Sequence, residues 1–158
     1  MPFAINSFYI AALILIIVID LEHRLILDVM TYPLTVVALL LSMVVVDLEN
    51  SIGLALLGAV VGFVIYYLFY LFGNVVFGEG ALGFGDVKLA MLMGAMLGFH
   101  RIIFTLMLAI FLGGIISVVL LISRRMGRYS YAPYGQYLAI AAIVMLIWGV
   151  QFYRWYIV

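Results

Sequence analysis

Two aspartates, Asp20 and Asp86, are the residues of this chain best suited to carry chemistry, because each directly abuts apolar sequence. A carboxylate inside a hydrophobic segment costs about 2.5–3.5 kcal/mol on insertion scales, so acids in such segments suggest a function. Two carboxylates that lie close together repel, and one of them then keeps a proton. The ionised member can take a proton from water while the protonated member donates to a carbonyl group. Taken singly, either aspartate is better explained as a solvated helix end.

Other catalytic chemistries find little support in the sequence. The chain has no cysteine, which excludes disulfides, thiolate metal sites and a cysteine nucleophile. Its two histidines, His23 and His100, are assigned to opposite membrane faces, which disfavours a histidine metal site or a serine triad. No phosphate-binding GxxxxGK[ST] loop occurs. The formal net charge is zero, so nucleic acid is not an expected partner. We expect no metal and no cofactor.

The elements that must position the two acids are membrane helices. Of the 158 residues, 70% are hydrophobic and 9% charged, whereas soluble domains carry about 25% charged residues. The first apolar stretch lacks a basic start and a good cleavage site, so we expect it to be retained. We predict one all-α domain over residues 1–158, with no soluble domain before or after it. Apolar runs predict six transmembrane helices: Phe3–Ile19, Thr31–Val46, Ser51–Phe72, Val87–Phe99, Ile102–Ser123 and Ala132–Val150. The fourth run has only 13 residues and by itself suggests a re-entrant segment, but it is counted as a span because the helix can begin earlier, at Gly83–Asp86.

Basic residues predict the orientation of this bundle, because cytoplasmic loops carry the excess of Lys and Arg. With six spans, the side with more basic residues holds Arg24, Lys88, Arg124, Arg125 and Arg128, and the other holds Arg101 and Arg154. The first side should face the cytoplasm, with both termini outside. The cytoplasmic side also holds most of the acids: Asp20, Glu22, Asp28, Glu79 and Asp86. Only Asp47 and Glu49 lie opposite.

Glycines surround the second acid. Gly83 and Gly85 permit positive φ and close approach by another chain, which predicts a loop at this point. A helix should then begin near Asp86, where a carboxylate suits the helix N-terminus. A second glycine pair, Gly58 and Gly62, has the spacing for close packing of membrane helices, which favours packing within one subunit over a dimer interface.

Three segments resemble a known family. Gly83–Leu89 resembles the GxGD signature of type IV prepilin peptidases, which are membrane aspartyl proteases, and Gly78–Gly80 resembles the acidic approach to it. Ile19–Asp28 is similar to the segment that supplies the family's first catalytic aspartate, including a second aspartate eight residues on. Pro133–Ala139 resembles the family's PFGPxLA segment. The three occur in the family's order and cover nearly the whole chain.

The resemblance implies roles for individual residues. Asp20 and Asp86 would be the catalytic pair. Substrate-binding or supporting roles would fall to Gly83, Gly85, Lys88, Glu22, Asp28 and Glu79. Two positions depart from the pattern, since Leu27 and Gln136 stand where the family often has proline.

The resemblance also implies an activity. The chain would be a peptidase of the bacterial-type inner membrane that cuts the leader from a prepilin or pseudopilin, after a glycine, at the cytoplasmic boundary. Its partners would be that substrate and the lipid bilayer. Many members carry a cytoplasmic insert with paired CxxC motifs, which this short form lacks, so zinc is not expected. A peptidase without the accompanying N-methyltransferase activity is the more economical interpretation.

Two other functions fit the intramembrane acids without the resemblance. One is a proton-coupled transporter or channel that uses both aspartates as a relay. The other is a non-catalytic scaffold of a pilus or secretion apparatus. For the peptidase, we expect the unliganded protein to hold both carboxylates on one water-accessible cavity, too far apart for a direct hydrogen bond.

Overall fold

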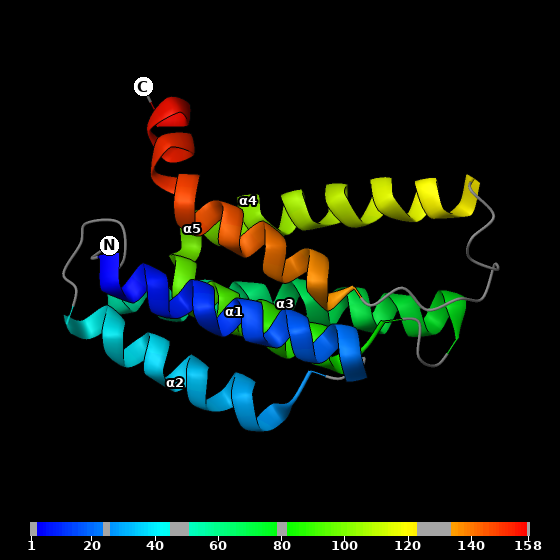
Figure 1. Cartoon of the computed structure of the whole chain (residues 1–158), viewed down its shortest axis with the longest axis horizontal. Helices are drawn as coiled ribbons and strands as arrows, with labels where there is room; N and C mark the ends of the chain where they lie inside the picture. The colour runs from blue at the N-terminus through cyan, green and yellow to red at the C-terminus, as the bar shows by residue number, and fades with distance from the viewer. Residues whose placement is uncertain (1–2, 24–25, 45–50, 79–81, 123–133, 158) are drawn as a thin grey trace.

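The computed structural model describes residues 3–23, 26–44, 51–78, 82–122 and 134–157. Its regular elements over these ranges are all helices, as predicted (Figure 1). In chain order they are α1 (Phe3–His23), α2 (Asp28–Val44), α3 (Ile52–Phe77), α4 (Phe84–Ile122) and α5 (Gly135–Ile157).

The length and hydropathy of the described helices indicate a membrane protein. Three of the described helices, α1, α3 and α4, are long and apolar enough to cross a bilayer, while α2 and the first part of α5 are shorter apolar helices. At most a third of the most apolar window of each long helix is buried inside the protein. The remaining apolar side chains face outward, and exposing so large an apolar surface to water is unfavourable. These side chains therefore contact lipid.

The predicted count of six helices is not confirmed, because α4 runs through both the fourth and the fifth predicted spans. Only Gly98, with φ 76° and ψ 172°, leaves helical geometry within it. This region of backbone space is essentially restricted to glycine. Figure 1 shows the two halves of α4 running in different directions. The helix therefore bends at Gly98 without a connecting loop.

Close packing between α3 and the first half of α4 forms the centre of the bundle. A Cβ on Gly58 would collide with the backbone at Gly94 and Gly98, and a Cβ on Gly62 with the carbonyl group of Ala90. Most of α4 from Val87 to Leu97 is fully buried. The glycine pair predicted to pack helices within one subunit does so.

Local sequence determines where several helices begin and end. The hydroxyl of Ser51 accepts a hydrogen bond from the backbone N–H of Leu54 and caps α3. At the other end, Gly78 adopts φ 91° and its N–H donates to the carbonyl oxygen of Asn74. Both α2 and α4 carry an aspartate in the first turn, where the partial positive charge of a helix N-terminus suits a carboxylate.

The membrane orientation stays a prediction. Four of the basic residues on which it depends, Arg24, Arg124, Arg125 and Arg128, lie outside the described residues. The acids Asp47 and Glu49, predicted for the opposite face, also lie outside them.

Candidate active site

Asp86 lies in the first turn of α4 and is 7% exposed. Its backbone N–H donates to the carbonyl oxygen of Gly83 at 3.1 Å, and the Gly83 backbone N–H donates to the Asp86 carboxylate. This reciprocal pair resembles a capping box and fixes the side chain at the helix start.

The loop predicted around this acid, over the GxGD motif, is not confirmed. Phe84 and Gly85 already belong to α4, and only Gly83 of the motif precedes the helix. Among the described glycines, positive φ occurs at Gly78 and Gly98 but not at Gly83 or Gly85. The predicted close approach does occur at Gly85, where an added Cβ would lie 2.9 Å from the Cβ of Ile26. Gly85 is thus required for packing, not for a turn.

Asp20 lies in the last turn of α1 and is 5% exposed. The backbone N–H of Gln136, in the first turn of α5, donates to its carboxylate. The Oδ2 atom of Asp20 is buried and accepts no hydrogen bond from the described residues. A buried acceptor without a donor is costly, and such exceptions suggest a functional group.

The two acids meet at Gly135, the first residue of α5. A Cβ built on Gly135 would lie 3.0 Å from Oδ2 of Asp20 and 3.1 Å from Oδ1 of Asp86. The two oxygens are therefore no farther apart than the sum of these distances. Figure 1 shows the end of α1 beside the starts of α4 and α5. The structure brings together the two acids that a dyad requires, while their catalytic role stays a prediction.

Both carboxylates are covered, whereas a water-accessible cavity was expected. Gly135 and Ile26 both lie close to the pair, and the Cδ1 of Ile26 would lie 2.8 Å from a Cβ on Gly135. Sequence reasoning missed both residues. The signal for Gly135 was its place in the segment Pro133–Ala139, but Ile26 is one isoleucine in an apolar chain and gave no signal.

Two tyrosines lie close enough to Asp86 to interact with it electrostatically. Tyr66 of α3 is 1% exposed, and Tyr134 directly precedes α5. Their ring centroids are 6.4 Å apart, and the buried hydroxyl of Tyr66 has no hydrogen-bond partner among the described residues. Sequence reasoning missed these residues because tyrosines of membrane proteins usually mark the interface with water.

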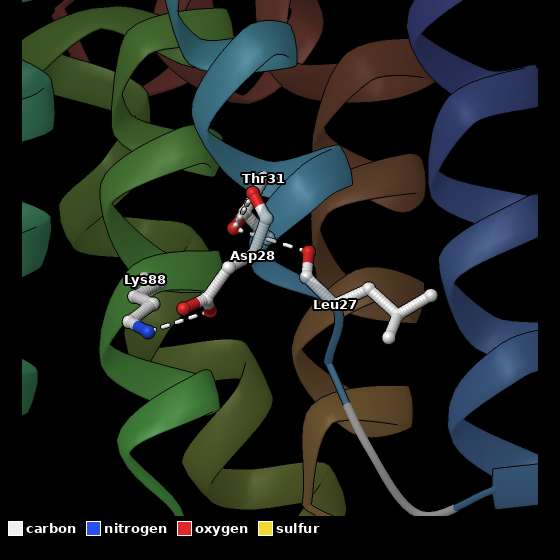
Figure 2. Close-up of polar contacts among 4 residues, drawn as sticks. All are labelled: Leu27, Asp28, Thr31 and Lys88. Carbon is white, nitrogen blue, oxygen red and sulfur yellow. Dashed lines mark hydrogen bonds and ion pairs between the residues drawn. The ribbon is translucent and has the colours of Figure 1, made fainter.

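The charged residues predicted to support the site have different surroundings in the structure. Lys88 and Asp28 meet, with Nζ and Oδ1 2.6 Å apart (Figure 2). Glu22 is exposed at the end of α1, with His23 at 3.9 Å. Glu79 lies outside the described residues. No group of three potential metal ligands gathers in the part of the chain that the structure describes.

Comparison with known proteins agrees with the motifs. Residues 7–118 match the Type IV leader peptidase family. Curated relatives named prepilin leader peptidase/N-methyltransferase include those of Pseudomonas aeruginosa, 36% identical over 88% of this chain, and of Aeromonas hydrophila, 32% identical over 88%. A relative from Legionella pneumophila is 28% identical over 92% of the chain.

The chain spans about half the length of these curated relatives, since the alignments cover 47–50% of them. No solved structure matches. The family match covers more than two thirds of the chain and includes both Asp20 and Asp86. The chain therefore belongs to the type IV leader peptidase family.

Proposed function

We propose that this chain is a membrane aspartyl endopeptidase that cleaves the leader from type IV prepilins or pseudopilins. The observation that carries the proposal is the convergence of Asp20 and Asp86 on the single point above Gly135. Acids from two helices far apart in the sequence meet there, next to two helix N-termini. Family membership supplies the class of reaction.

The geometry suits hydrolysis of a peptide bond. Two carboxylates this close repel when both are ionised, so the working pair holds one proton. The ionised member would take a proton from the attacking water, and the protonated member would donate to the oxygen of the scissile carbonyl group. When the tetrahedral intermediate collapses, a proton must pass to the leaving amine, and the carboxyl that gained one from water can supply it.

The substrate would approach from the bilayer. Asp20 and Asp86 stand at the ends of membrane-spanning helices, so the pair lies near a membrane boundary. An apolar substrate helix beside the bundle would place its leader at this level. From the basic residues we expect this to be the cytoplasmic face of the inner membrane, and from the family resemblance we expect glycine before the cleaved bond.

A cleavage assay tests the proposal. The full chain in detergent is incubated with a candidate prepilin, and the products are sized. Asp20→Asn and Asp86→Asn should each lower the rate by about 10²–10⁴-fold, the contribution of general acid–base catalysis. The double variant should be scarcely worse than either single one, because the acids act as a unit.

The control is Asp47→Asn, predicted for the opposite face, which should cleave at the wild-type rate. Substantial activity in either single variant would contradict the dyad. Proton flux into liposomes that depends on both acids, without cleavage of any prepilin, would support a transporter instead.

A further inference from the structure

Ile26 lies close to the acid pair, because its Cδ1 and one oxygen of each carboxylate surround the same point above Gly135. Its Cβ would be 2.9 Å from a Cβ on Gly85, and its Cδ1 would be 2.8 Å from a Cβ on Gly135. The side chain is therefore wedged between the first turn of α4 and the first turn of α5. Neither glycine could carry a side chain while Ile26 holds this position.

The wedge occupies space that the reaction needs. The Cδ1 of Ile26, the Oδ2 of Asp20 and the Oδ1 of Asp86 all surround the same point above Gly135, each at about 3 Å. A scissile carbonyl group must come within hydrogen-bond distance of a protonated carboxyl, and water must reach the other acid. Both aspartates are less than a tenth exposed, so neither the carbonyl group nor water has free access to them in this structure. Ile26 is a side chain beside them whose movement would open this access.

An ion pair two residues further on ties this segment to the helix that carries Asp86. Asp28 is the first residue of α2, and its carboxylate pairs with the ammonium group of Lys88 at 2.6 Å (Figure 2). Lys88 is two residues beyond Asp86 in α4. Its side chain is only 12% exposed, and its ammonium lies 5.0 Å from the ring centroid of Phe84 and 5.5 Å from that of Tyr32. The lysine is thus well ordered on α4.

Hydrogen bonds to the backbone of Leu27 also hold the residue next to Ile26 in place. The carbonyl oxygen of Leu27 accepts from the N–H of Met30 at 3.0 Å and from that of Thr31 at 3.1 Å. The hydroxyl of Thr31 also donates toward Leu27 at 3.4 Å, as Figure 2 shows. Leu27 is therefore fixed to the first turn of α2, and Ile26 directly precedes it.

We propose that Ile26 is a stopper over the acid pair and that the Asp28–Lys88 ion pair is the latch that keeps it closed in the resting enzyme. Ile26 then sets access to the reaction, and Asp28 and Lys88 are positioning residues that act through it. The Asp28 side chain is 55% exposed, so solvent weakens the pair and lets it open. This inference rests on the proposed function, because it concerns access to the same two acids.

The test uses no substrate, so it can fail independently of the proposed function. The purified full chain in detergent is treated with dicyclohexylcarbodiimide, and modification of Asp20 and Asp86 is followed by mass spectrometry. Ile26→Ala should label faster than wild type. Asp28→Asn and Lys88→Met should label about two- to fivefold faster, the range that a half-exposed ion pair contributes.

A charge swap separates the latch from general loss of structure. The double variant Asp28→Lys with Lys88→Asp should return the labelling rate toward wild type, whereas each single reversal should raise it. A double variant that labels as fast as the single reversals would overturn the latch.

The matched control is Ile143→Ala, which removes the same atoms from a partly buried position two turns into α5. It should label at the wild-type rate. If Ile26→Ala does not fold, Ile26→Val removes only the Cδ1 atom that faces the acids. Labelling of the folded Ile26 variant at the wild-type rate would overturn the stopper.

Discussion

At the scale of single residues, the site depends on glycine at position 135, which has no Cβ. Gly135 presents its backbone to both carboxylates, and the position of its absent Cβ lies about 3 Å from each. The side chains of Asp20 and Asp86 are held by N–H groups at the starts of α5 and α4, namely those of Gln136 and Gly83. The positions of the two acids therefore depend on backbone N–H groups at the starts of both helices.

Gly135→Ala should consequently damage turnover more than folding. The new methyl group would lie 3.0 Å and 3.1 Å from the two carboxylate oxygens and 2.8 Å from the Cδ1 of Ile26, so these neighbours must shift by a few tenths of an ångström. A misplacement of about 1 Å can cost about 10²-fold in rate, so this smaller shift should cost about 3- to 10-fold. The measurement is kcat in the cleavage assay together with thermal unfolding.

The matched control is Gly114→Ala, also in a helix, where an added Cβ meets nothing within 4 Å. This variant should keep full activity. Its free energy of unfolding should rise by about 0.5–1 kcal/mol, because alanine stabilises a helix interior relative to glycine. A Gly135→Ala enzyme with wild-type kcat would contradict the account of the site.

The two glycines of the motif should respond differently. At Gly85 an added Cβ would be 2.9 Å from the Cβ of Ile26, which is part of a fixed backbone segment, whereas at Gly83 it would meet only Oδ2 of Asp86 at 3.6 Å. Gly85→Ala should therefore lower the cleavage rate and the melting temperature, and Gly83→Ala should be nearly neutral in both. Equal losses of cleavage rate and melting temperature in the two variants would contradict the close packing of Gly85 against Ile26.

The sequence predicted the acids but not their surroundings, for a physical reason. Asp20 and Asp86 stand out because a carboxylate beside apolar residues is unfavourable without a purpose. Ile26 and Tyr66 are chemically ordinary in a chain that is 70% hydrophobic. Their importance comes from three-dimensional neighbours that no local pattern encodes.

At the scale of elements, α4 differs most from the prediction. His100 and Arg101 interrupt the apolar sequence and resemble a connection between two helices. In the structure the helix continues through both residues, and Arg101 is 7% exposed, with its Cδ 3.2 Å from a Cβ built on Gly149 of α5. A long side chain packed against a glycine is a tertiary contact, so composition could not distinguish this bend from a loop.

The bend makes Gly98 a sensitive position. Its φ of 76° and ψ of 172° are accessible at low cost only to glycine. Gly98→Ala should destabilise the protein by about 1–3 kcal/mol, the strain of such a conformation. Thermal unfolding in detergent measures this loss.

The control for the bend is Gly53→Ala in the first turn of α3, where the nearest atom to an added Cβ is the Ser51 hydroxyl at 3.9 Å. It should not lower the melting temperature. An unchanged melting temperature for Gly98→Ala would mean that α4 can bend here without the backbone conformation that only glycine adopts at low cost.

At the scale of the whole molecule, composition alone predicted the class correctly. A chain that is 9% charged cannot cover itself with polar groups, and the three long helices do expose apolar surface. The arrangement of the helices depends on glycine contacts such as Gly58 with Gly94. Gly58 and Gly62 have the spacing for close packing, as do Gly94 and Gly98, but the sequence does not show which helix packs against which.

The orientation is testable because the chain has no cysteine. In intact cells, an impermeant thiol reagent should label Arg154→Cys and leave Arg128→Cys unlabelled, since basic residues concentrate on the cytoplasmic side. Permeabilised cells should label both. Labelling at position 128 but not at 154 would invert the topology and move the acids to the outer face.

The order of the elements along the chain also limits when the site can exist. Asp20 is on the first helix, Asp86 on the fourth, and the Gln136 N–H that holds Asp20 on the last. Ribosomes deliver these helices from the N-terminus onward, so Asp20 waits in the bilayer until α5 has been synthesised. The hydrogen bond from Gln136 that holds Asp20 therefore forms only after both acids are already in the membrane.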